Sequence, residues 1–433
     1  MRIVNLSLWI SNLMALISPD TWQKIERCNV LLVRGDGDCG YTYQGKGYAH
    51  LIDSIGDLCM NRGLISHTVS TPYSKLTGTN AYNSPVSYNR SALSITLIRS
   101  IVRLIRGHTN SVNWANKCLT HLWSRIFEKA KPHCVIGIQP SESLCRAGKI
   151  KGIPVYDLQH GMMNEEHPWY GEKYRVTTPS KDLPDGFLCW DEPSAATLRK
   201  WAPQRGIDVR VIGNPWFSRF LLKKPTDILV QETVARGRIF NNSHPIILVS
   251  LQYGLDIFYK DVRFNGVMVN ALEKVIVETS DSYNWLLRLH PVQIRGWRKG
   301  LVQGYLTRTF GHLKSVEWRA SSEYPLPVVL QQVDLHITDM STVVVEAGWM
   351  GVYSALLNIN IHPRGSLASI CAHERSLHIA EVLTQDTNII KEWIKNTLGK
   401  GRCNSTLKDT STALDAFIDE IASDYSGKVD PKN

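Results

Sequence analysis

The feature that most constrains this fold is a repeated alternation of short β-rich runs, polar or glycine-rich loops, and helical stretches. The first copy places a strand at about Val30 to Val33 and a helix from near Tyr48. A later copy places strands at Cys134 to Ile138 and Pro154 to Leu158, with a helix over ESLCRAGKI between them. Parallel sheets flanked by helices produce this pattern. The sequence therefore predicts an α/β protein with doubly wound sheets.

The length of the chain predicts two domains, because 433 residues exceed what one hydrophobic core usually supports. The alternation lapses between Phe217 and His244 and then restarts with HPIILVSLQYG. We expect Rossmann-like domains over 1–217 and 244–400, a linker over 218–243, and a C-terminal amphipathic helix and tail over 401–433. Leu414, Phe417, Ile418 and Ile421 share one face of that helix.

Composition excludes several classes of protein. Hydrophobic residues at 43% and charged residues at 20% are typical of a soluble globular chain. In the opening MRIVNLSLWISNLMALI, Asn5, Ser7, Ser11 and Asn12 interrupt the apolar run, and the segment lacks the features of a secretory signal, so we expect a cytoplasmic protein. Nine cysteines without any C-x-x-C pair favour buried thiols over disulfides, and we expect no metal site.

A net charge of +10 and a pI near 9.1 raise the question of nucleic-acid binding. Lysine and arginine are spread along the chain without a basic run or a recognisable nucleic-acid module. We therefore expect no nucleic-acid partner. An anionic substrate or peripheral contact with an anionic membrane surface accounts equally well for the excess charge.

The segment GDGDCG, residues 35–40, matches the G-x-G-x-x-G pattern of dinucleotide folds. Asp36 and Asp38 would place like charge against a pyrophosphate, and the next strand does not end in an acidic residue for a ribose. The same residues form an Asp-x-Asp pair. Both a turn with solvated aspartates and a role in orienting an acceptor hydroxyl are compatible with it, and Gln44 lies close by in sequence.

Two later segments point to an anion site. WLLRLHP ends a strand at Arg288 and His290, and Pro291 fixes the following turn. In TDMSTVVVEAGWMG, Ser341 and Thr342 open a helix, where hydroxyls and unpaired N–H groups favour a phosphate. Glu346, one turn further, is placed to accept hydrogen bonds from ribose hydroxyls.

The loop LQHGMMNEEHPWY follows a predicted strand directly. Gln159 can bridge two polar groups, His160 can hydrogen-bond a carboxylate substrate, and Gly161 lets the backbone approach a ligand. Glu165 and Glu166 are candidates for taking a proton from an acceptor hydroxyl. The alternative is that both glutamates are solvated loop residues.

The His-Pro and Ser-Thr segments resemble those of GT-B glycosyltransferases that use CMP-activated acidic sugars, such as bacterial polysialyltransferases and lipooligosaccharide sialyltransferases. The Gln-His-Gly loop, GNPWF and RGDGDCGYTYQGKGYAHLID look closer to the retaining β-Kdo transferases of lipopolysaccharide and capsule assembly. This resemblance implies two Rossmann-like domains that face one another across a cleft. It makes the first domain the acceptor side and the second the nucleotide-sugar side.

Roles follow from the resemblance. It implies that His290, Ser341 and Thr342 hold the phosphate and ribose of the CMP donor. From their positions we expect Arg288, Pro291, Glu346, Gln159 and Gly161 to complete the nucleotide-sugar site, with CMP-Kdo as the favoured donor. We expect Asp36, Asp38 and Gln44 to bind the acceptor, a surface glycan or lipid-linked glycan. We expect His160, Glu165, Glu166 and a nucleophilic aspartate to carry out catalysis. Position favours Asp256 in SLQYGLD as nucleophile, with Asp36 and Asp38 as the other candidates. No cofactor is implied besides the donor substrate.

The chain departs from the pattern at Gly351, Val352 and Tyr353, where many related helices continue with Gly-Val-Pro. An inverting sialyltransferase, a UDP-sugar transferase and a sugar 2-epimerase share the same architecture. A non-catalytic carbohydrate-binding assembly subunit is the alternative from another class. The sequence does not choose the acceptor, the linkage or the stereochemical course.

Overall fold

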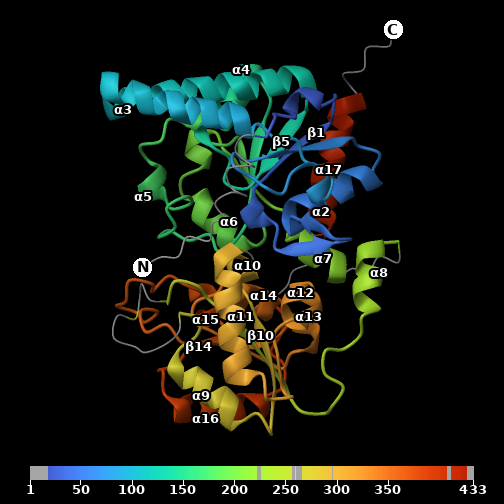
Figure 1. The fold of residues 1–433 in the computed structure, drawn as a ribbon, viewed down its shortest axis with the longest axis vertical. Coiled ribbons are helices and arrows are strands. Elements are labelled where there is room, and N and C mark those ends of the chain that lie inside the picture. The colour runs from blue at the N-terminus through green and yellow to red at the C-terminus, as the bar shows by residue number, and fades with distance from the viewer. Residues whose placement is uncertain are drawn as a thin grey trace. The chain divides into compact units, whose positions relative to one another are not determined.

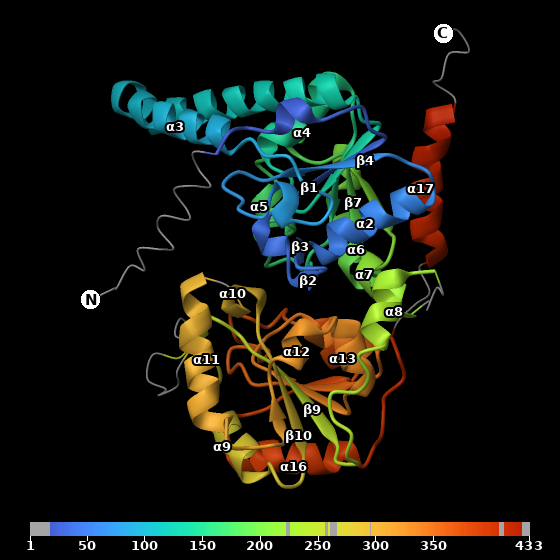
Figure 2. The ribbon, with the colours of Figure 1, turned by 45° about the vertical axis from the view of Figure 1, so that its right-hand side comes forward.

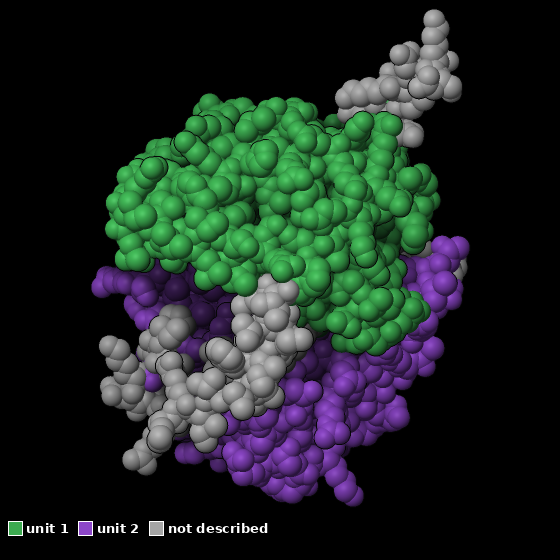
Figure 3. All heavy atoms as spheres, turned by 45° about the horizontal axis from the view of Figure 1, so that its top comes forward, with its two compact units in different colours: residues 1–218, 409–433 green, residues 219–408 purple. Residues whose placement is uncertain are grey.

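The chain folds into two compact units in a computed structural model that describes residues 18–221, 226–255, 259, 266–294, 296–406 and 411–426. Unit 1 comprises residues 1–218 and 409–433, and unit 2 comprises residues 219–408 (Figure 3). Each unit is built on a six-stranded sheet whose paired strands all run parallel. The predicted class, two parallel α/β domains, is confirmed.

The sheet of unit 1 has the strand order β4-β1-β5-β6-β7-β8. Its strands are β1 (Val30–Arg34), β4 (Ser66–Ser70), β5 (Cys134–Gly137), β6 (Val155–Leu158), β7 (Gly186–Cys189) and β8 (Asp208–Val211). A separate antiparallel hairpin joins β2 (Tyr41–Tyr43) to β3 (Lys46–Tyr48). Positive φ angles of 49° and 74° at Gln44 and Gly45 make its two-residue turn.

Helices cover the sheet of unit 1 (Figure 1). They are α2 (His50–Asn61), α3 (Asn89–Ala130), α4 (Glu142–Lys151), α5 (Glu172–Arg175), α6 (Glu192–Arg199), α7 (Pro215–Leu221), which runs into unit 2, and α17 (Ser411–Ser426). The described residues of this unit also form the 3₁₀ turns η1 (Trp22–Lys24), η2 (Asp36–Asp38), η3 (Gly78–Asn80), η4 (Ser180–Asp182) and η5 (Pro203–Arg205).

Unit 2 has the strand order β11-β10-β9-β12-β13-β14. The strands are β9 (Ile246–Ser250), β10 (Asn284–Arg288), β11 (Val316–Glu317), β12 (Leu335–Thr338), β13 (Tyr353–Leu356) and β14 (Ala380–Val382). The helices are α8 (Ile228–Val234), α9 (Asn270–Glu278), α10 (Pro291–Ile294), α11 (Gly296–Phe310), α12 (Ala320–Glu323), α13 (Leu326–Gln332), α14 (Val343–Trp349), α15 (Ala372–Ser376) and α16 (Thr387–Leu398). Figure 2 shows α11 on one side of these strands, α12 and α13 on the other, and α16 below them.

Apolar strands explain why each sheet is covered on both faces. Every residue of β1 (VLLVR) and of β9 (IILVS) is buried, so neither strand has a solvent face. In unit 2, side chains of α9, α11 and α16 join those of the strands in a single core around the fully buried Trp285. Because the faces of each sheet are covered, polar residues gather in the loops at the carboxyl ends of the strands, where open α/β sheets bind ligands.

The C-terminal helix α17 packs on unit 1. The four residues predicted to share a helical face, Leu414, Phe417, Ile418 and Ile421, are buried. Phe417 stands edge-on to Tyr156 of β6 with ring centroids 5.2 Å apart. No helix in the described part of the chain combines the length and apolar character that spanning a bilayer requires.

Candidate functional site

The carboxyl edge of the first sheet brings Asp38 and His160 together. Asp38 follows β1 and His160 follows β6, on either side of the end of β5. The His160 Nε2 atom lies 3.8 Å from the Asp38 Oδ1 atom. The Asp38 side chain is 16% exposed and that of His160 is 44% exposed, so the carboxylate is sheltered and the imidazole remains open to solvent.

Burial raises the pKa of Asp38 above its ordinary value, and the charge of His160 opposes that shift. The other Asp38 oxygen, Oδ2, accepts a 2.6 Å hydrogen bond from the Gly35 backbone N–H, which fixes the side chain within η2. A Cβ added at Gly35 would lie 3.0 Å from the Thr71 hydroxyl, so the backbone at Gly35 packs closely against the segment that follows β4. We name this feature the Asp38–His160 pair.

Asp36 has a different environment. Its two carboxylate oxygens accept backbone hydrogen bonds from Lys75 and Leu76, at 2.8 and 3.1 Å. These bonds attach the segment that follows β4 to η2. The two aspartates of the GDGDCG segment therefore differ: Asp36 organises the loop, and Asp38 meets a histidine.

A buried ion pair supports the end of β1. Arg34 Nη1 lies 2.5 Å from Asp53 Oδ2, and both side chains are almost completely buried. Asp53 also accepts a 2.7 Å hydrogen bond from the Ala49 backbone N–H at the start of α2. Burial raises the pKa of Asp53 to about 7, against the opposing effect of Arg34. The pair joins α2 to the residue immediately before Gly35.

Gln159 uses its whole amide inside the protein. Its Nε2 donates to the Gly161 carbonyl and the Ser194 hydroxyl, at 2.8 and 2.9 Å, and its Oε1 accepts from the Trp190 backbone N–H at 2.6 Å. The side chain is 2% exposed. Gln159 bridges polar groups, as the sequence suggested, but those groups are protein groups, so the residue positions His160 and leaves no amide atom free for a ligand.

The segment 159–171, which we call the QHG loop, is anchored from beneath by Asp157. This fully buried carboxylate accepts hydrogen bonds from the Gln139 backbone N–H and the Trp169 indole, at 2.8 and 2.7 Å. Burial raises the pKa of Asp157 to about 7. A Cβ added at Gly171 would lie 2.0 Å from the Glu165 carbonyl oxygen, so only glycine fits where the loop closes.

Glu165 and Glu166 lie on the surface of the QHG loop. Glu165 pairs with Lys200 and Glu166 with Lys173, and both carboxylates are more than half exposed. Gln44 is exposed at the hairpin turn, where its Nε2 donates to the Tyr43 hydroxyl at 3.2 Å. The structure does not bring these residues to the Asp38–His160 pair by any hydrogen bond or ion pair among the described residues.

Arg175, which the sequence analysis did not single out, is buried beneath the QHG loop. Its guanidinium stacks on Trp169 at 4.1 Å, and Nε and Nη2 make no hydrogen bond within the described part of the chain. Desolvation lowers its pKa, and the charge of Asp157 opposes that shift. Its only sequence signal is an isolated arginine after HPWY, a pattern too weak to predict burial.

The second sheet places the predicted donor residues on both sides of the end of β9. His290 follows β10, and Ser341 and Thr342 follow β12. The His290 backbone N–H donates to Gln293 at 2.7 Å, and its Nδ1 accepts from the Val292 N–H at 3.2 Å, so the ring is held at the start of α10. Pro291 is the first residue of that helix, where its missing N–H is not needed.

Ser341 and Thr342 differ in how they use their hydroxyls. Ser341 Oγ accepts from the Val343 N–H at 3.2 Å at the start of α14. The Thr342 hydroxyl makes no hydrogen bond to any residue that the structure describes. The Thr342 hydroxyl can therefore donate and accept toward a ligand, and the Ser341 hydroxyl can still donate its proton.

Arg288 and Glu346 lie close enough for their charges to interact. Burial raises the pKa of Glu346 to about 8, and Arg288 opposes the shift. Arg288 Nη1 donates to the carbonyl oxygens of Ser321 and Tyr324, the latter at 2.8 Å. This raised pKa favours the protonated form of the Glu346 carboxyl, which can both donate and accept hydrogen bonds.

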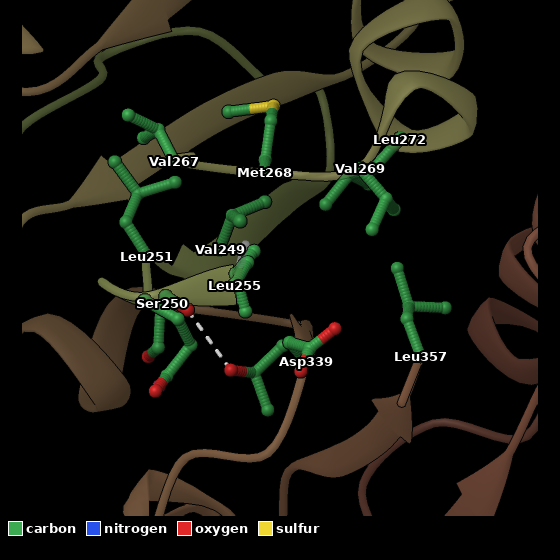
Figure 4. Close-up of a pocket in the computed structure, with 12 residues that line it drawn as sticks. Val249, Ser250, Leu251, Leu255, Val267, Met268, Val269, Leu272, Asp339 and Leu357 are labelled. Carbon is green, nitrogen blue, oxygen red and sulfur yellow. Dashed lines mark hydrogen bonds between the residues drawn. The ribbon is translucent and has the colours of Figure 1, made fainter. Parts of the chain in front are cut away.

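A small, mostly apolar pocket lies in unit 2 at the carboxyl ends of β9 and β12 (Figure 4). Its lining includes Leu251, Val267 and Met268, and Asp339 lies at the strand ends. The buried Asp339 carboxylate accepts hydrogen bonds from the Tyr259 hydroxyl and the Asn358 amide, at 2.5 and 2.7 Å. Asp256, the predicted nucleophile, lies outside the described residues.

Solved structures match most of the chain. UDP-GlcNAc 2-epimerase from Methanocaldococcus jannaschii is 12% identical with a TM-score of 0.57, over 91% of this chain and 99% of that one. The enzyme of the same name from Neisseria meningitidis, bound to UDP-GlcNAc, is 13% identical with a TM-score of 0.52, over 91% and 100%. The wall teichoic acid polymerase TagF is 12% identical with a TM-score of 0.52, over 98% and 96%.

The chain has the GT-B fold. No protein-family model and no curated protein sequence matches it. At 12–13% identity these likenesses establish the architecture alone. Among the residues that the structure describes, no three His, Cys, Asp or Glu side chains are grouped to bind a metal ion.

Proposed function

We propose that this GT-B protein is a glycosyltransferase that moves an acidic sugar, with Kdo from CMP-Kdo as the favoured donor, onto a bacterial surface glycan. The observation that carries the proposal is the Asp38–His160 pair, a solvent-open imidazole beside a sheltered carboxylate at the edge of a doubly wound sheet. Glycosyl transfer requires a group that removes the proton of the acceptor hydroxyl. The choice of Kdo comes from the motif resemblance.

His160 takes the role of general base in this proposal. Asp38 stabilises the imidazolium that forms when His160 accepts the acceptor proton, and Gln159 holds the loop in position. Asp36 supports the pair by shaping the loop, since both its oxygens already accept backbone hydrogen bonds. Glu165 and Glu166 have surface lysine partners and no such geometry, so we assign them no step.

The donor is held in unit 2. Thr342 and Ser341 bind the phosphate of the nucleotide sugar, and His290 adds a further hydrogen bond to it. Glu346 binds the ribose hydroxyls. The Arg288 guanidinium, which donates to the Tyr324 carbonyl, opposes the rise in the pKa of Glu346.

A retaining course would require a carboxylate nucleophile. Asp256 remains the prediction for that role. Of the two alternatives in unit 1, Asp38 is the better candidate because one of its oxygens faces His160 rather than a backbone N–H.

The second candidate function is sugar-nucleotide 2-epimerisation. The observation in its favour is the architectural likeness to two UDP-GlcNAc 2-epimerases. An epimerase acts on the nucleotide sugar alone, whereas a transferase also requires an acceptor. The dependence of product formation on an acceptor separates the two functions.

Calorimetric titration of CMP, UMP, CDP and UDP, with and without Mg²⁺, tests the proposal. The variant Thr342→Val removes a hydroxyl that has no hydrogen-bond partner among the described residues, and Thr384→Val is the matched control at an exposed position of unit 2. We expect CMP to bind best and Thr342→Val to weaken it roughly 10- to 100-fold, the effect of losing a hydrogen bond to a charged group. Preference for UDP, with Thr342→Val unchanged, would contradict the donor assignment.

A further inference from the structure

Helix α3 contains an exposed apolar segment that the proposed function does not explain. The chain changes direction at Gly107, whose φ of 79° and ψ of 173° are not helical. We call residues 89–106 the first limb and residues 108–130 the second limb. Figure 2 shows the two limbs meeting at an end that projects beyond the sheet of unit 1.

The second limb packs into unit 1, and the first limb packs only at its start. Trp123, Ile126 and Phe127 of the second limb are buried in the core. In the first limb Asn89 and Ala92 are buried, but from Thr96 to Arg106 every residue is exposed or half-exposed. The first limb is thus a helix that leaves the body of unit 1 after its opening turn.

Large apolar side chains occupy this exposed stretch. Their exposed fractions are Leu97 59%, Ile98 44%, Ile101 57%, Leu104 87% and Ile105 74%. Single exposed apolar residues are common on protein surfaces, but a contiguous group on one element marks an interaction site.

Arginines occupy the other face of the same stretch. Arg99, Arg103 and Arg106 are spaced i, i+4 and i+7, so they line up along one side of the helix. No acidic residue occurs between Asn89 and Phe127. A helix with an apolar face and an arginine-rich polar face is the type that lies in the plane of a lipid–water interface.

We propose that the first limb is an interfacial helix that binds unit 1 to an anionic lipid bilayer. Its apolar side chains enter the boundary between headgroups and acyl chains, and the arginines contact anionic headgroups. Charge complementarity selects this occupant. A second copy of the chain could cover the apolar face, but it would leave the arginines of the opposite face without an acidic partner, because the limb carries no acidic residue.

Gly107 makes the arrangement possible. Its φ and ψ lie in a region that is open only to glycine, and they let the first limb diverge while the second limb stays packed. The proposal does not rest on the proposed function, because it concerns a surface distant in sequence from both sets of site residues.

Cosedimentation with vesicles tests the proposal on the full chain. We expect binding to phosphatidylcholine vesicles that contain about a third phosphatidylglycerol, at least tenfold weaker binding to pure phosphatidylcholine, and loss of binding at high salt. Absence of binding to the anionic vesicles would overturn the proposal.

Three variants locate the contact. Ile101→Asn with Leu104→Asn should weaken binding at least tenfold, whereas the control Ile150→Asn with Val176→Asn, at positions of unit 1 that are 63% and 64% exposed, should bind as wild type. Arg99→Gln with Arg103→Gln and Arg106→Gln should weaken binding to anionic vesicles roughly a hundredfold. Equal losses in the control would overturn the proposal.

Two further readouts separate the possible occupants. Hydrogen exchange should slow in peptides from residues 95–106 when anionic vesicles are added. Unchanged exchange there would place the lipid contact elsewhere and overturn the assignment. Concentration-dependent dimerisation without lipid that Ile101→Asn with Leu104→Asn abolishes would identify a second copy as the occupant, and would also overturn it.

Discussion

At the scale of single residues, the candidate site depends on polar side chains whose hydrogen bonds are already committed. Gln159 and Asp157 hold the QHG loop, and Asp36 holds η2, so that His160 and Asp38 are the polar groups left to meet one another. We therefore assign the proposed chemistry to the Asp38–His160 pair, because the surrounding polar side chains serve to position it.

Gln159→Ala should destabilise unit 1. The change leaves the Trp190 N–H and the Ser194 hydroxyl without their partner in a buried region, at a cost of about 2–4 kcal/mol. Gln204→Ala, at an exposed glutamine whose amide donates to a surface carbonyl, should change stability by less than about 0.5 kcal/mol. Thermal unfolding measures both, and equal midpoints for the two variants would refute the structural role of Gln159.

The pH dependence of unit 2 should depend on His336. This fully buried imidazole makes 2.9 Å hydrogen bonds with Ser250 and Ser354, and burial lowers its pKa from 6.5 to about 3. Below pH 6.5 His336 therefore becomes protonated in the unfolded chain, whereas in the native state it stays neutral down to about pH 3. Stability is lost as the pH falls through this window, by up to roughly 1.4 kcal/mol per pH unit.

His336→Gln removes this titration. We expect the unfolding midpoint of the variant to fall less steeply with decreasing pH than that of the wild type, even if the variant is less stable at neutral pH. Parallel pH profiles would show that His336 does not stay neutral in the folded protein.

At the scale of elements, the QHG loop owes its shape to close packing at one glycine. Gly171→Ala places a Cβ where the Glu165 carbonyl lies, so we expect unit 1 to lose about 2–4 kcal/mol or the loop to rearrange. Gly300→Ala is the matched control: it lies in α11 with open space around it, and alanine should be neutral or stabilising by about 0.5–1 kcal/mol. Calorimetric scans measure both, and a neutral Gly171→Ala would mean that the loop is not packed as described.

The elements that could be predicted from sequence are the continuous apolar strands. The runs VLLV and IILVS predicted β1 and β9, because strands buried on both faces carry no polar alternation. The hairpin β2–β3 was missed, since its Gln44-Gly45 turn lacks the usual Asn-Gly signal. The predicted linker 218–243 contains α8, a helix too short to be recognised by periodicity.

Proximity in the site was the part that sequence could not supply. His160 and the Asp-x-Asp segment were each singled out, but their meeting depends on the strand order β1-β5-β6, which no local pattern encodes. The burial of Gln159 could not be predicted either. Its amide is typical of ligand-binding residues, but the structure places it in the environment of a core residue.

At the scale of the whole molecule, the chain returns to its first unit through α17. Phe417→Ala should destabilise unit 1 by about 3–5 kcal/mol, because removing this buried ring leaves a cavity beside Tyr156. Asp419→Ala removes only an exposed ion pair with Arg62, 2.8 Å long, and should cost less than about 1 kcal/mol. A Phe417→Ala variant with the wild-type unfolding profile would show that unit 1 is complete without its C-terminal helix.

The central claim is that the Asp38–His160 pair serves sugar transfer. The most direct test incubates the protein with CMP-Kdo or UDP-GlcNAc, with and without a glycan acceptor, and follows the products by mass spectrometry for wild type, His160→Asn and Asp38→Asn. We predict acceptor-dependent transfer from CMP-Kdo, reduced about 10²- to 10⁴-fold in His160→Asn with nucleotide affinity unchanged. Conversion of UDP-GlcNAc without an acceptor, or full transfer by His160→Asn, would contradict the account.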